Sequence, residues 1–382
     1  MNNFIRSFRL ALEVSPLIED NYTGISNVAF EIAIRALYDS RLEIIFFISN
    51  LVVPEIVIKK CLENRNGKAL REFLSFNQYS DIYNLKINKN IIALYTNTKP
   101  INKKFNYESQ IIYDLSTFIV PECHTEDTIK YHANGIIDQI NSCDILFCIS
   151  DSTAIDVENI FEVKREKIHV IPLGSNINLQ QVQATRKFIE TSILGVEPYI
   201  LILGTIEPRK NISLILNWIK QYPQITNSYR FIFAGRHGWG PSFEDLINSA
   251  GLFNEYNSRK ISWYGFVDEN SKAILLSGAS CLIFSSLFEG FGLPVLEAMS
   301  AGVIVLSSSS TSMPEILGDC GYYFNPESIK SLQDAFLQFT IDKLEPGVHE
   351  TLIKKALQRT ANFSYDKAYE IIISSLNGLM SQ

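Results

Sequence analysis

The sequence lacks the paired cysteines that mark metal sites and disulfide frameworks. Its six cysteines include no Cys-x-x-Cys pair, and Cys148 and Cys281 sit within apolar runs. Cysteines of this kind are typical of reduced, buried thiols in a cytoplasmic protein. We therefore expect a cytoplasmic location, no disulfide and no cysteine-bound metal.

Three motifs of nucleotide-handling proteins are also missing. There is no Asp-x-Asp triplet, so a divalent-metal clamp for a diphosphate has no support. There is no Gly-x-x-x-x-Gly-Lys-Ser/Thr loop and no Gly-x-Gly-x-x-Gly opening, which disfavours a P-loop NTPase and makes a nicotinamide enzyme the least favoured class. We expect neither a metal nor a resident cofactor.

Positive charge and long hydrophobic runs are scarce. The formal net charge is −7, which disfavours nucleic acid as a partner but leaves room for a small anion at a local basic cluster. Residues 1–14 contain no long apolar core and other apolar runs have strand length, so we expect no signal peptide and no spanning helix. Lys99, Lys103 and Lys104 leave open a peripheral contact with a membrane, against the alternative of scattered surface lysines.

Twelve apolar runs dominate the rest of the chain, which has 382 residues and is 46% hydrophobic. Runs that are apolar at nearly every position are typical of parallel strands covered on both faces by helices. The runs form two series. The first series comprises residues 9–14, 43–49, 90–95, 110–115, 145–150 and 168–173. The second series comprises residues 199–204, 229–235, 261–265, 281–286, 303–308 and 321–326. We predict an α/β protein with two doubly wound domains, 1–178 and 179–364, separated within the polar interval 174–197. Ligands of such sheets bind beyond the carboxyl ends of strands, so the expected site is a cleft between facing domains.

The stretch 284–302 carries the strongest local signal. A strand runs into a loop with Gly290 and Gly292, and Pro294 opens a helix. Glycines allow close approach of a ligand, and the free N–H groups of a helix start attract anions. Glu289 and Glu297 bracket this element, although acidic residues near a helix start are also common on solvated faces.

A second loop, 204–211, places Arg209 and Lys210 just before a predicted helix. Cations at that end of a helix are unfavourable unless something negative is bound, which favours a phosphate ligand over a bland basic turn. In the segment 233–240, Gly235 suits a close backbone approach, whereas Arg236, His237 and Trp239 fit a solvated loop.

Together, the Glu-x7-Glu pattern of 289–297 and the GTIEPRKN segment resemble retaining glycosyltransferases of family 4, which have the GT-B fold of two Rossmann-like domains. The resemblance implies that Arg209 and Lys210 hold the donor diphosphate, that Glu297 binds the donor ribose, and that Glu289 binds the transferred sugar. It further implies that a final helix, about 365–382, crosses back to the first domain. Other implied donor contacts are Gly24, Gly204, Gly235, Val267 beside the nucleobase, Gly290, Phe291, Gly292 and Leu293.

The resemblance is thinner in the first domain. Gly24 stands alone where the family often has two glycines, and Asn27 occupies the place of a following arginine. Residues 111–128 resemble an HD…PExH region of bacterial polysaccharide enzymes, with Tyr113 replacing the histidine. Asp114, Glu122 and His124 would then meet the acceptor, or they are loop residues. Ser150 and Ser152 fit a helix N-cap better than a ligand.

These resemblances imply a metal-independent hexosyltransferase that takes a nucleoside-diphosphate sugar and extends an oligosaccharide or lipid-linked glycan in surface-polysaccharide assembly. The subgroup favours mannose or rhamnose. Two alternatives stay open, a GT-B nucleotide-sugar epimerase and a non-catalytic glycosyltransferase-like scaffold.

Overall fold

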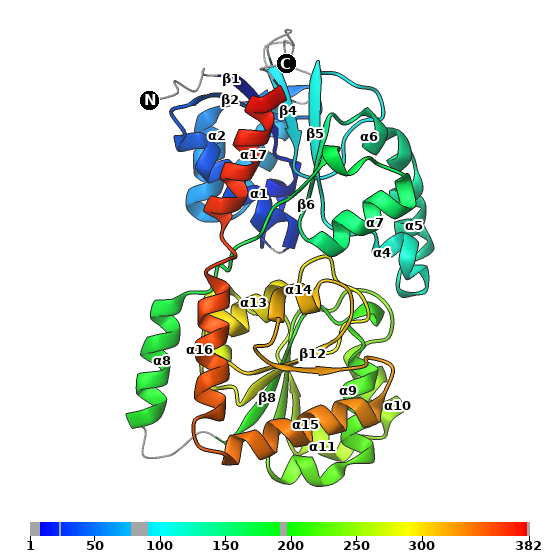
Figure 1. Cartoon of the computed structure of the whole chain (residues 1–382), viewed down its shortest axis with the longest axis vertical. Helices are drawn as coiled ribbons and strands as arrows, with labels where there is room; N and C mark the ends of the chain where they lie inside the picture. Colours follow the sequence, from blue (N-terminus) through cyan, green and yellow to red (C-terminus); the bar gives the residue numbers. More distant parts are fainter. Residues whose placement is uncertain (1–7, 23, 78–90, 192–196, 380–382) are drawn as a thin grey trace. The chain divides into compact units, whose positions relative to one another are not determined.

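The computed structural model describes residues 8–22, 24–77, 91–191 and 197–379. The chain divides into two compact units (Figure 1). The first unit comprises Met1–Leu115, Lys130–Leu173 and Ser364–Gln382, and the second comprises Ser116–Ile129 and Gly174–Phe363. The division at Gly174 falls inside the polar interval where the sequence predicts a boundary, while the segment Ser116–Ile129 groups with the second unit.

The first unit is built on a seven-stranded sheet in the order β3-β2-β1-β4-β5-β6-β7. The six apolar runs of the first series form its parallel strands, as predicted, and the strands β1, β4, β5 and β6 are buried along most of their length. The short edge strand β3 is antiparallel to β2 and was not predicted. The strands are β1 Phe8–Glu13, β2 Leu42–Ile48, β3 Leu51–Val53, β4 Ile91–Tyr95, β5 Tyr107–Ile112, β6 Ile145–Cys148 and β7 Ile168–Val170.

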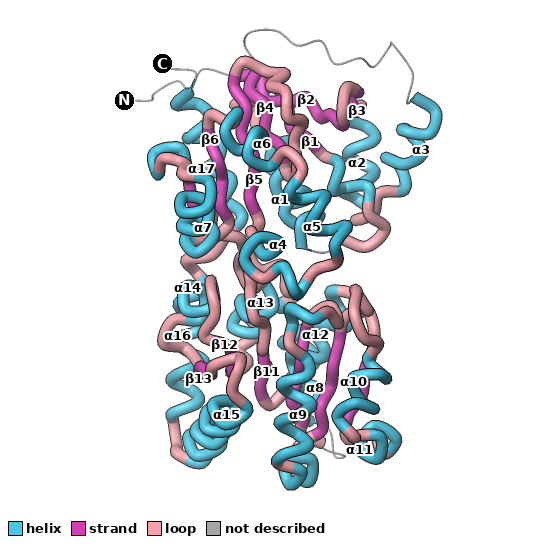
Figure 2. The backbone as a smooth tube through the Cα atoms, turned by 90° about the vertical axis from the view of Figure 1, so that its right-hand side faces the viewer, coloured by secondary structure: helices cyan, strands magenta, loops and turns pink. Residues whose placement is uncertain are grey.

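Helices lie on both faces of this sheet (Figure 2). The helix predicted to return to the first domain does so as α17, which lies beside α1 and is joined to it by an ion pair of 2.7 Å between Arg35 and Asp366. The helices are α1 Gly24–Tyr38, α2 Glu55–Asn64, α3 Lys68–Asn77, α5 Glu126–Ala133, α6 Ile136–Ser142, α7 Asp151–Phe161 and α17 Tyr365–Leu379, with 3₁₀ turns η1 Ser15–Ile18 and η4 Arg165–Lys167.

The second unit has a six-stranded parallel sheet in the order β10-β9-β8-β11-β12-β13. The chain builds outward from β8 in one direction and from β11 in the other, so the strand order reverses between these two neighbours. Such a switch point leaves a crevice beyond the carboxyl ends of the two strands. The strands are β8 Tyr199–Leu203, β9 Arg230–Ala234, β10 Ile261–Trp263, β11 Cys281–Phe284, β12 Val305–Ser308 and β13 Tyr322–Phe324.

The core of this unit is organised around Trp218, which is fully buried. Its ring packs edge-on against Phe231 and Phe336, and its Nε1 donates to Gln333 at 2.7 Å.

The polar interval 174–197 contains a helix, α8. The helices are α4 Ser116–Ile119, α8 Leu179–Thr191, α9 Ile212–Gln221, α10 Phe243–Ala250, α11 Phe253–Asn257, α12 Glu269–Gly278, α13 Leu293–Ser300, α14 Met313–Leu317, α15 Ile329–Leu344 and α16 Val348–Thr360, with η3 Pro121–Cys123, η5 Pro208–Lys210 and η6 Pro223–Asn227.

A buried carboxyl group ends β1. Burial raises the pKa of Glu13 to about 7, and its hydrogen bonds with Ser15 and Thr96 only partly oppose this. Because the folded pKa lies above the unfolded value of 4.5, this group's contribution to stability is full below pH 4.5 and is lost as the pH rises through 7.

Replacing Glu13 by Gln removes that dependence and keeps an oxygen for the Ser15 amide, which donates at 2.8 Å. We expect the unfolding free energy of Glu13→Gln to fall less between pH 5 and pH 8 than that of the wild type, by up to about 3 kcal/mol. Urea denaturation at the two pH values measures this, and an identical fall in both proteins would contradict it.

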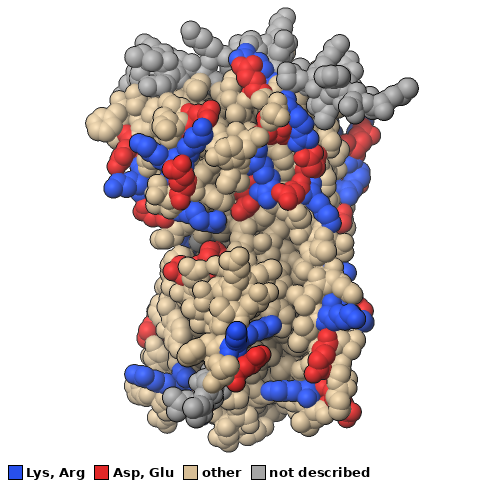
Figure 3. Space-filling view, turned by 90° about the vertical axis from the view of Figure 1, so that its left-hand side faces the viewer, with Lys and Arg blue, Asp and Glu red and all other residues tan. Residues whose placement is uncertain are grey.

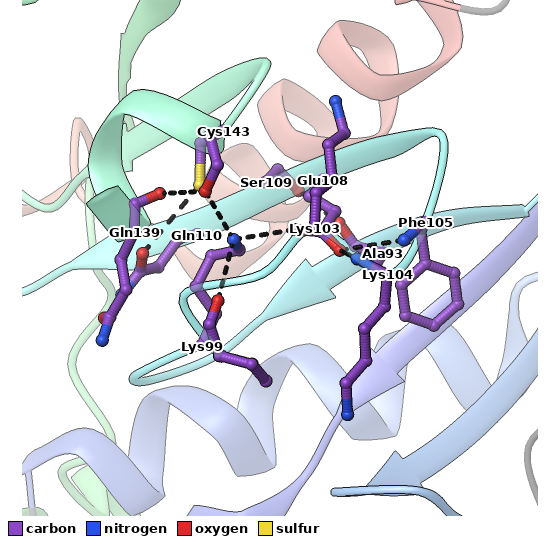
Figure 4. Close-up of polar contacts among 12 residues, drawn as sticks. Ala93, Lys99, Lys103, Lys104, Phe105, Glu108, Ser109, Gln110, Gln139 and Cys143 are labelled. Atoms are coloured by element: carbon purple, nitrogen blue, oxygen red, sulfur yellow. Dashed lines mark hydrogen bonds and ion pairs between the residues drawn. The ribbon is translucent and has the colours of Figure 1, made fainter. Parts of the chain in front are cut away.

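Lys99 corrects the expectation that three lysines face a membrane. Its side chain has 0% exposure and forms an ion pair of 2.8 Å with Glu108, whose exposure is also 0% (Figure 4). Lys103 pairs with Asp144 instead. Charges of both signs are interspersed over the first unit in Figure 3. Lys99 therefore cannot contact a bilayer. Among the described residues, no helix is both long and apolar enough to span one.

Candidate functional site

Two loops meet beyond the carboxyl ends of β8 and β11. The amide of Leu287 donates to the carbonyl of Arg209 at 2.9 Å, and the Ser285 hydroxyl donates to the carbonyl of Lys210 at 2.8 Å. A small cavity beside them is lined by Gly204, Lys210, Ser285 and Ser286, among others. The two segments predicted to form an anion site are thus fastened to each other at the switch point of the sheet.

Four charged side chains form a compact cluster at this junction. Glu289 accepts Arg209 at 3.0 Å and Lys210 at 2.5 Å, and Glu207 accepts Arg209 at 2.8 Å. Glu289 is only 10% exposed. Two cations and two carboxylates give the cluster a formal charge of zero.

The environment of Glu289 favours its ionised form. Burial alone would raise its pKa, but the charges of Arg209 and Lys210 outweigh burial and lower the pKa to about 2. Glu289 is therefore a carboxylate at neutral pH and can accept hydrogen bonds from hydroxyl groups.

This pairing changes one step of the sequence argument. In the sequence, two cations before a helix favour a negative ligand, and Glu289, 79 positions after Lys210, provides negative charge within the protein. The position of Arg209 and Lys210 therefore no longer favours a phosphate on electrostatic grounds alone. Their role with a diphosphate stays a prediction.

The loop that carries Glu289 is held by two residues that the sequence analysis missed. Thr311 accepts from the Glu289 amide at 3.0 Å and donates to its carbonyl at 2.9 Å. The Ser312 hydroxyl lies 3.0 Å from the Glu289 carbonyl and 2.8 Å from that of Phe291. The serine-rich run 307–312 was the only signal for this support.

Helix α13 begins as predicted. Gly292 precedes it with φ 106°, a left-handed conformation that favours glycine, and Pro294 lies in its first turn. Gly290 and Leu293 flank this start on the same loop. The Phe291 ring is buried and packs edge-on against Phe363 at 5.9 Å, so only the backbone of Phe291 remains for the predicted ligand contact.

Glu297, on α13, forms a second ion pair that the sequence did not reveal. Lys272 of α12 lies 2.5 Å from Glu297 and 3.0 Å from Glu269. Burial raises the pKa of Glu297, and Lys272 opposes that rise. The two glutamates of the motif therefore occupy contrasting environments, since the pKa of Glu289 is lowered and that of Glu297 is raised.

Gly235 lies against the backbone of Gly204 and leaves no room for a side chain. A Cβ on Gly235 would lie 1.8 Å from the Gly204 carbonyl oxygen, and both glycines have positive φ. The Gly235 carbonyl accepts from the Trp263 ring at 2.8 Å. Val267 follows β10 in a half-buried loop before α12. Close packing of β8 and β9 thus accounts for Gly235.

The predicted acceptor residue His124 belongs to the second unit, because it lies in Ser116–Ile129. Its ring is 5.7 Å from that of Trp239, whose Nε1 donates to the Cys123 carbonyl at 2.8 Å. Burial and Glu122 raise the pKa of Cys123, while Arg209 opposes them. Trp239 is therefore a packing partner of this segment rather than part of a solvated loop.

Asp114 lies in the first unit, after β5. Burial and the charge of Asp114 raise the pKa of Asp156, and burial lowers the pKa of His132 while Asp114 opposes it. The Tyr113 hydroxyl donates to the Thr96 carbonyl at 2.8 Å. The structure thus groups Asp114 with Asp156 and His132, while His124 belongs to the other unit.

At the start of α1, Gly24 has no atom within 4 Å of a hypothetical Cβ, so packing does not require glycine there. The Asn27 side chain accepts from Arg65 at 3.0 Å, and that guanidinium lies 4.3 Å from the Phe30 ring centre. Arg65 lies at the end of α2, and its contact with Asn27 was not predicted from the sequence.

Ser150 is confirmed as the N-cap of α7, because its hydroxyl oxygen accepts a hydrogen bond from the Thr153 amide at 3.0 Å.

Comparison with known proteins shows which families and folds the chain resembles. Residues 185–359 match the family of glycosyl transferases group 1. O-antigen chain mannosyltransferase B of Escherichia coli is 28% identical over 257 residues, 66% of each chain. The serotype-specific mannosyltransferase WbdA of the same species is 26% identical over 256 residues, 66% of this chain but 31% of WbdA. The match spans less than two thirds of either relative's length.

Among solved structures, sucrose-phosphate synthase from Thermosynechococcus elongatus has a TM-score of 0.68 at 16% identity, covering 98% of this chain and 99% of that one. The chain therefore has the predicted GT-B fold, which it shares with this solved structure. Its resemblance to the glycosyl transferases group 1 family covers residues 185–359, and the activity is a matter for proposal. Membership of family 4 and retention of configuration stay predictions.

Proposed function

We propose that this protein transfers a hexose, mannose in the first instance, from a nucleoside-diphosphate sugar to a glycan acceptor of surface-polysaccharide assembly. The cluster of Arg209, Lys210 and Glu289 at the switch point carries this proposal, because it sets two cations and one ionised carboxylate at a single place. The mannosyltransferase relatives favour mannose. The six cysteines, all free and buried, support a cytoplasmic setting.

Breaking the bond between sugar and diphosphate leaves negative charge on the departing phosphate. Arg209 and Lys210 are placed to stabilise that growing charge, and interactions that strengthen as charge develops are those that accelerate a reaction. We propose that the acceptor attacks from the face that the phosphate leaves and that the phosphate takes the acceptor proton. The anomeric configuration is then retained, and neither a side-chain nucleophile nor a metal is required.

Glu289 has two roles in this proposal. Without donor it neutralises both cations, whereas Glu207 pairs with Arg209 and not with Lys210. When the diphosphate binds, it replaces part of this contact, and the Glu289 carboxylate becomes free to accept hydroxyl groups of the sugar. The cations are thus never buried without a counter-charge.

A panel of UDP-, GDP- and dTDP-sugars tests the proposal. We expect release of the nucleoside diphosphate to be fastest with one mannose or rhamnose donor and to rise at least about tenfold when a mannan-type oligosaccharide acceptor is added, because the domain match supports transfer and not hydrolysis.

Two outcomes would contradict this function. An epimerised sugar from donor incubated alone would indicate an epimerase. Calorimetric binding of a donor without turnover over the full acceptor panel would indicate a scaffold. The anomeric configuration of the product, read by NMR coupling constants, decides between retention and inversion.

A further inference from the structure

Lys272 forms a largely buried ion pair in the second unit that has no role in the scheme above. It lies in the first turn of α12, directly after the Val267 loop, where a positive charge is unfavourable next to the free N–H groups of a helix start. Two carboxylates compensate it, Glu269 on its own helix and Glu297 on α13. The ion pair therefore joins α12, which follows the loop of Val267 predicted to lie beside the base, to Glu297, which is predicted to bind the ribose.

The geometry leaves one oxygen of Glu297 available. Lys272 Nζ donates to Oε1 at 2.5 Å. Within the described part of the chain, Oε2 accepts no hydrogen bond, although Glu297 is buried. A buried carboxylate with one oxygen fixed and the other open is suited to accept a hydroxyl group from a ligand.

We propose that Lys272 is a positioning residue for nucleotide recognition: it holds Glu297 ionised and in the orientation that accepts a ribose hydroxyl group. This rests on the proposed function. Without Lys272, a buried carboxyl group beside the second carboxylate of Glu269 is neutralised by a proton, and a protonated acid is a poorer acceptor.

Other charges near α13 do not replace Lys272. The groups that act on Glu297 are Lys272 and Glu269, both from α12. Charged residues of neighbouring elements have partners of their own: Arg359 with the Glu315 and Ile316 carbonyls, Lys355 with Asp319, and Arg186 with the Gly302 carbonyl. The charge state of Glu297 therefore depends on one cation.

The test is calorimetric titration of the full chain with UDP and GDP between pH 6 and pH 9. We expect Lys272→Met to bind the preferred nucleotide at least about tenfold more weakly than the wild type at pH 6.5, the loss of one charge-assisted hydrogen bond. We expect the deficit to shrink towards pH 9 as Glu297 loses its proton. Lys272→Arg, which keeps the charge, should restore most of the affinity at pH 6.5.

Two further variants separate positioning from folding. In the Glu297→Gln background no carboxyl group can titrate, so adding Lys272→Met should leave the pH profile flat and change affinity little. Lys330→Met is the matched control, because Lys330 pairs with Asp334 on the surface and is 79% exposed. It should bind like the wild type.

The outcomes are distinct. A wild type that binds neither UDP nor GDP, and releases no nucleoside diphosphate from any donor of the panel, refutes the proposed function and this inference with it. A wild type that binds, beside a Lys272→Met variant with equal affinity or with a deficit that is the same at every pH, overturns the role of Lys272 alone.

Discussion

Replacing Arg209 and Lys210 together by Ala is expected to reduce transfer by a factor on the order of 10³ or more, since two groups that stabilise the departing phosphate are lost. The structure shows a further effect. The same change leaves the buried Glu289 carboxylate without its cations, which costs roughly 3–5 kcal/mol of unfolding free energy when a buried pair is broken.

Adding Glu289→Gln to the double variant separates the two effects. The neutral amide removes the buried charge of Glu289 but not that of Glu207, which also loses Arg209. Part of the stability should therefore return, while transfer and nucleoside-diphosphate binding should stay lost. Urea denaturation at pH 7 measures the first, and product formation and calorimetry measure the second.

The matched control is Arg230→Ala with Lys260→Ala, because these two cations share Glu197 at a more exposed place in the same unit. We expect this pair to change stability by less than about 1 kcal/mol. Near-normal transfer by the Arg209 and Lys210 double variant would refute the phosphate role, and wild-type stability would refute the dependence of Glu289 on its partners.

Lys99→Met is expected to destabilise the first unit by roughly 3–5 kcal/mol, because it strands Glu108 in the interior. The three donors of Lys99 are used by Glu108 at 2.8 Å, Ser142 at 2.7 Å and the Pro100 carbonyl at 3.2 Å. Glu108 in turn accepts the amides of Lys104 and Phe105 (Figure 4). Among the described residues, Glu108 Oε2 accepts no hydrogen bond and has only the ion pair with Lys99, so removal of Lys99 leaves this buried oxygen without its counter-charge.

The double variant Lys99→Met with Glu108→Gln should recover most of this loss, since the glutamine oxygen still accepts the two amides. Lys164→Met is the control, because Lys164 is 77% exposed and 3.8 Å from Glu166, and it should shift stability by less than about 0.5 kcal/mol. Chemical denaturation followed by circular dichroism measures all three. A Lys99→Met protein as stable as the control would show that burying Glu108 without Lys99 costs no unfolding free energy.

The fold was largely predictable because its signals are local. Runs such as 199–204 and 281–286 are apolar at nearly every position, and each became a buried parallel strand. The short antiparallel β3 was missed because Leu51–Val53 is too brief for a pattern. Helix α8 was missed because only Val182 of its residues is buried, so its sequence resembles a polar linker.

The site was predictable in its residues but not in its contacts. The motifs selected Arg209, Lys210, Glu289 and Glu297, and the structure places the first three in one cluster. No local pattern indicates that a carboxylate 79 positions away neutralises two cations. Lys272 escaped notice for the same reason, since within its own helix it resembles a surface lysine beside Glu269. Burial and distant pairing depend on tertiary structure, which a single sequence does not encode in any short window.

Because Ser116–Ile129 belongs to the second unit, the chain cannot be cut at one point into two complete units. The chain passes between the units after residues 115, 129, 173 and 363, so no single cut yields both halves complete. A fragment beginning at Gly174 would lack the Cys123 carbonyl that receives the Trp239 ring nitrogen. Chimeras that exchange the second unit with that of a related protein should therefore carry this short insertion along with residues 174–363.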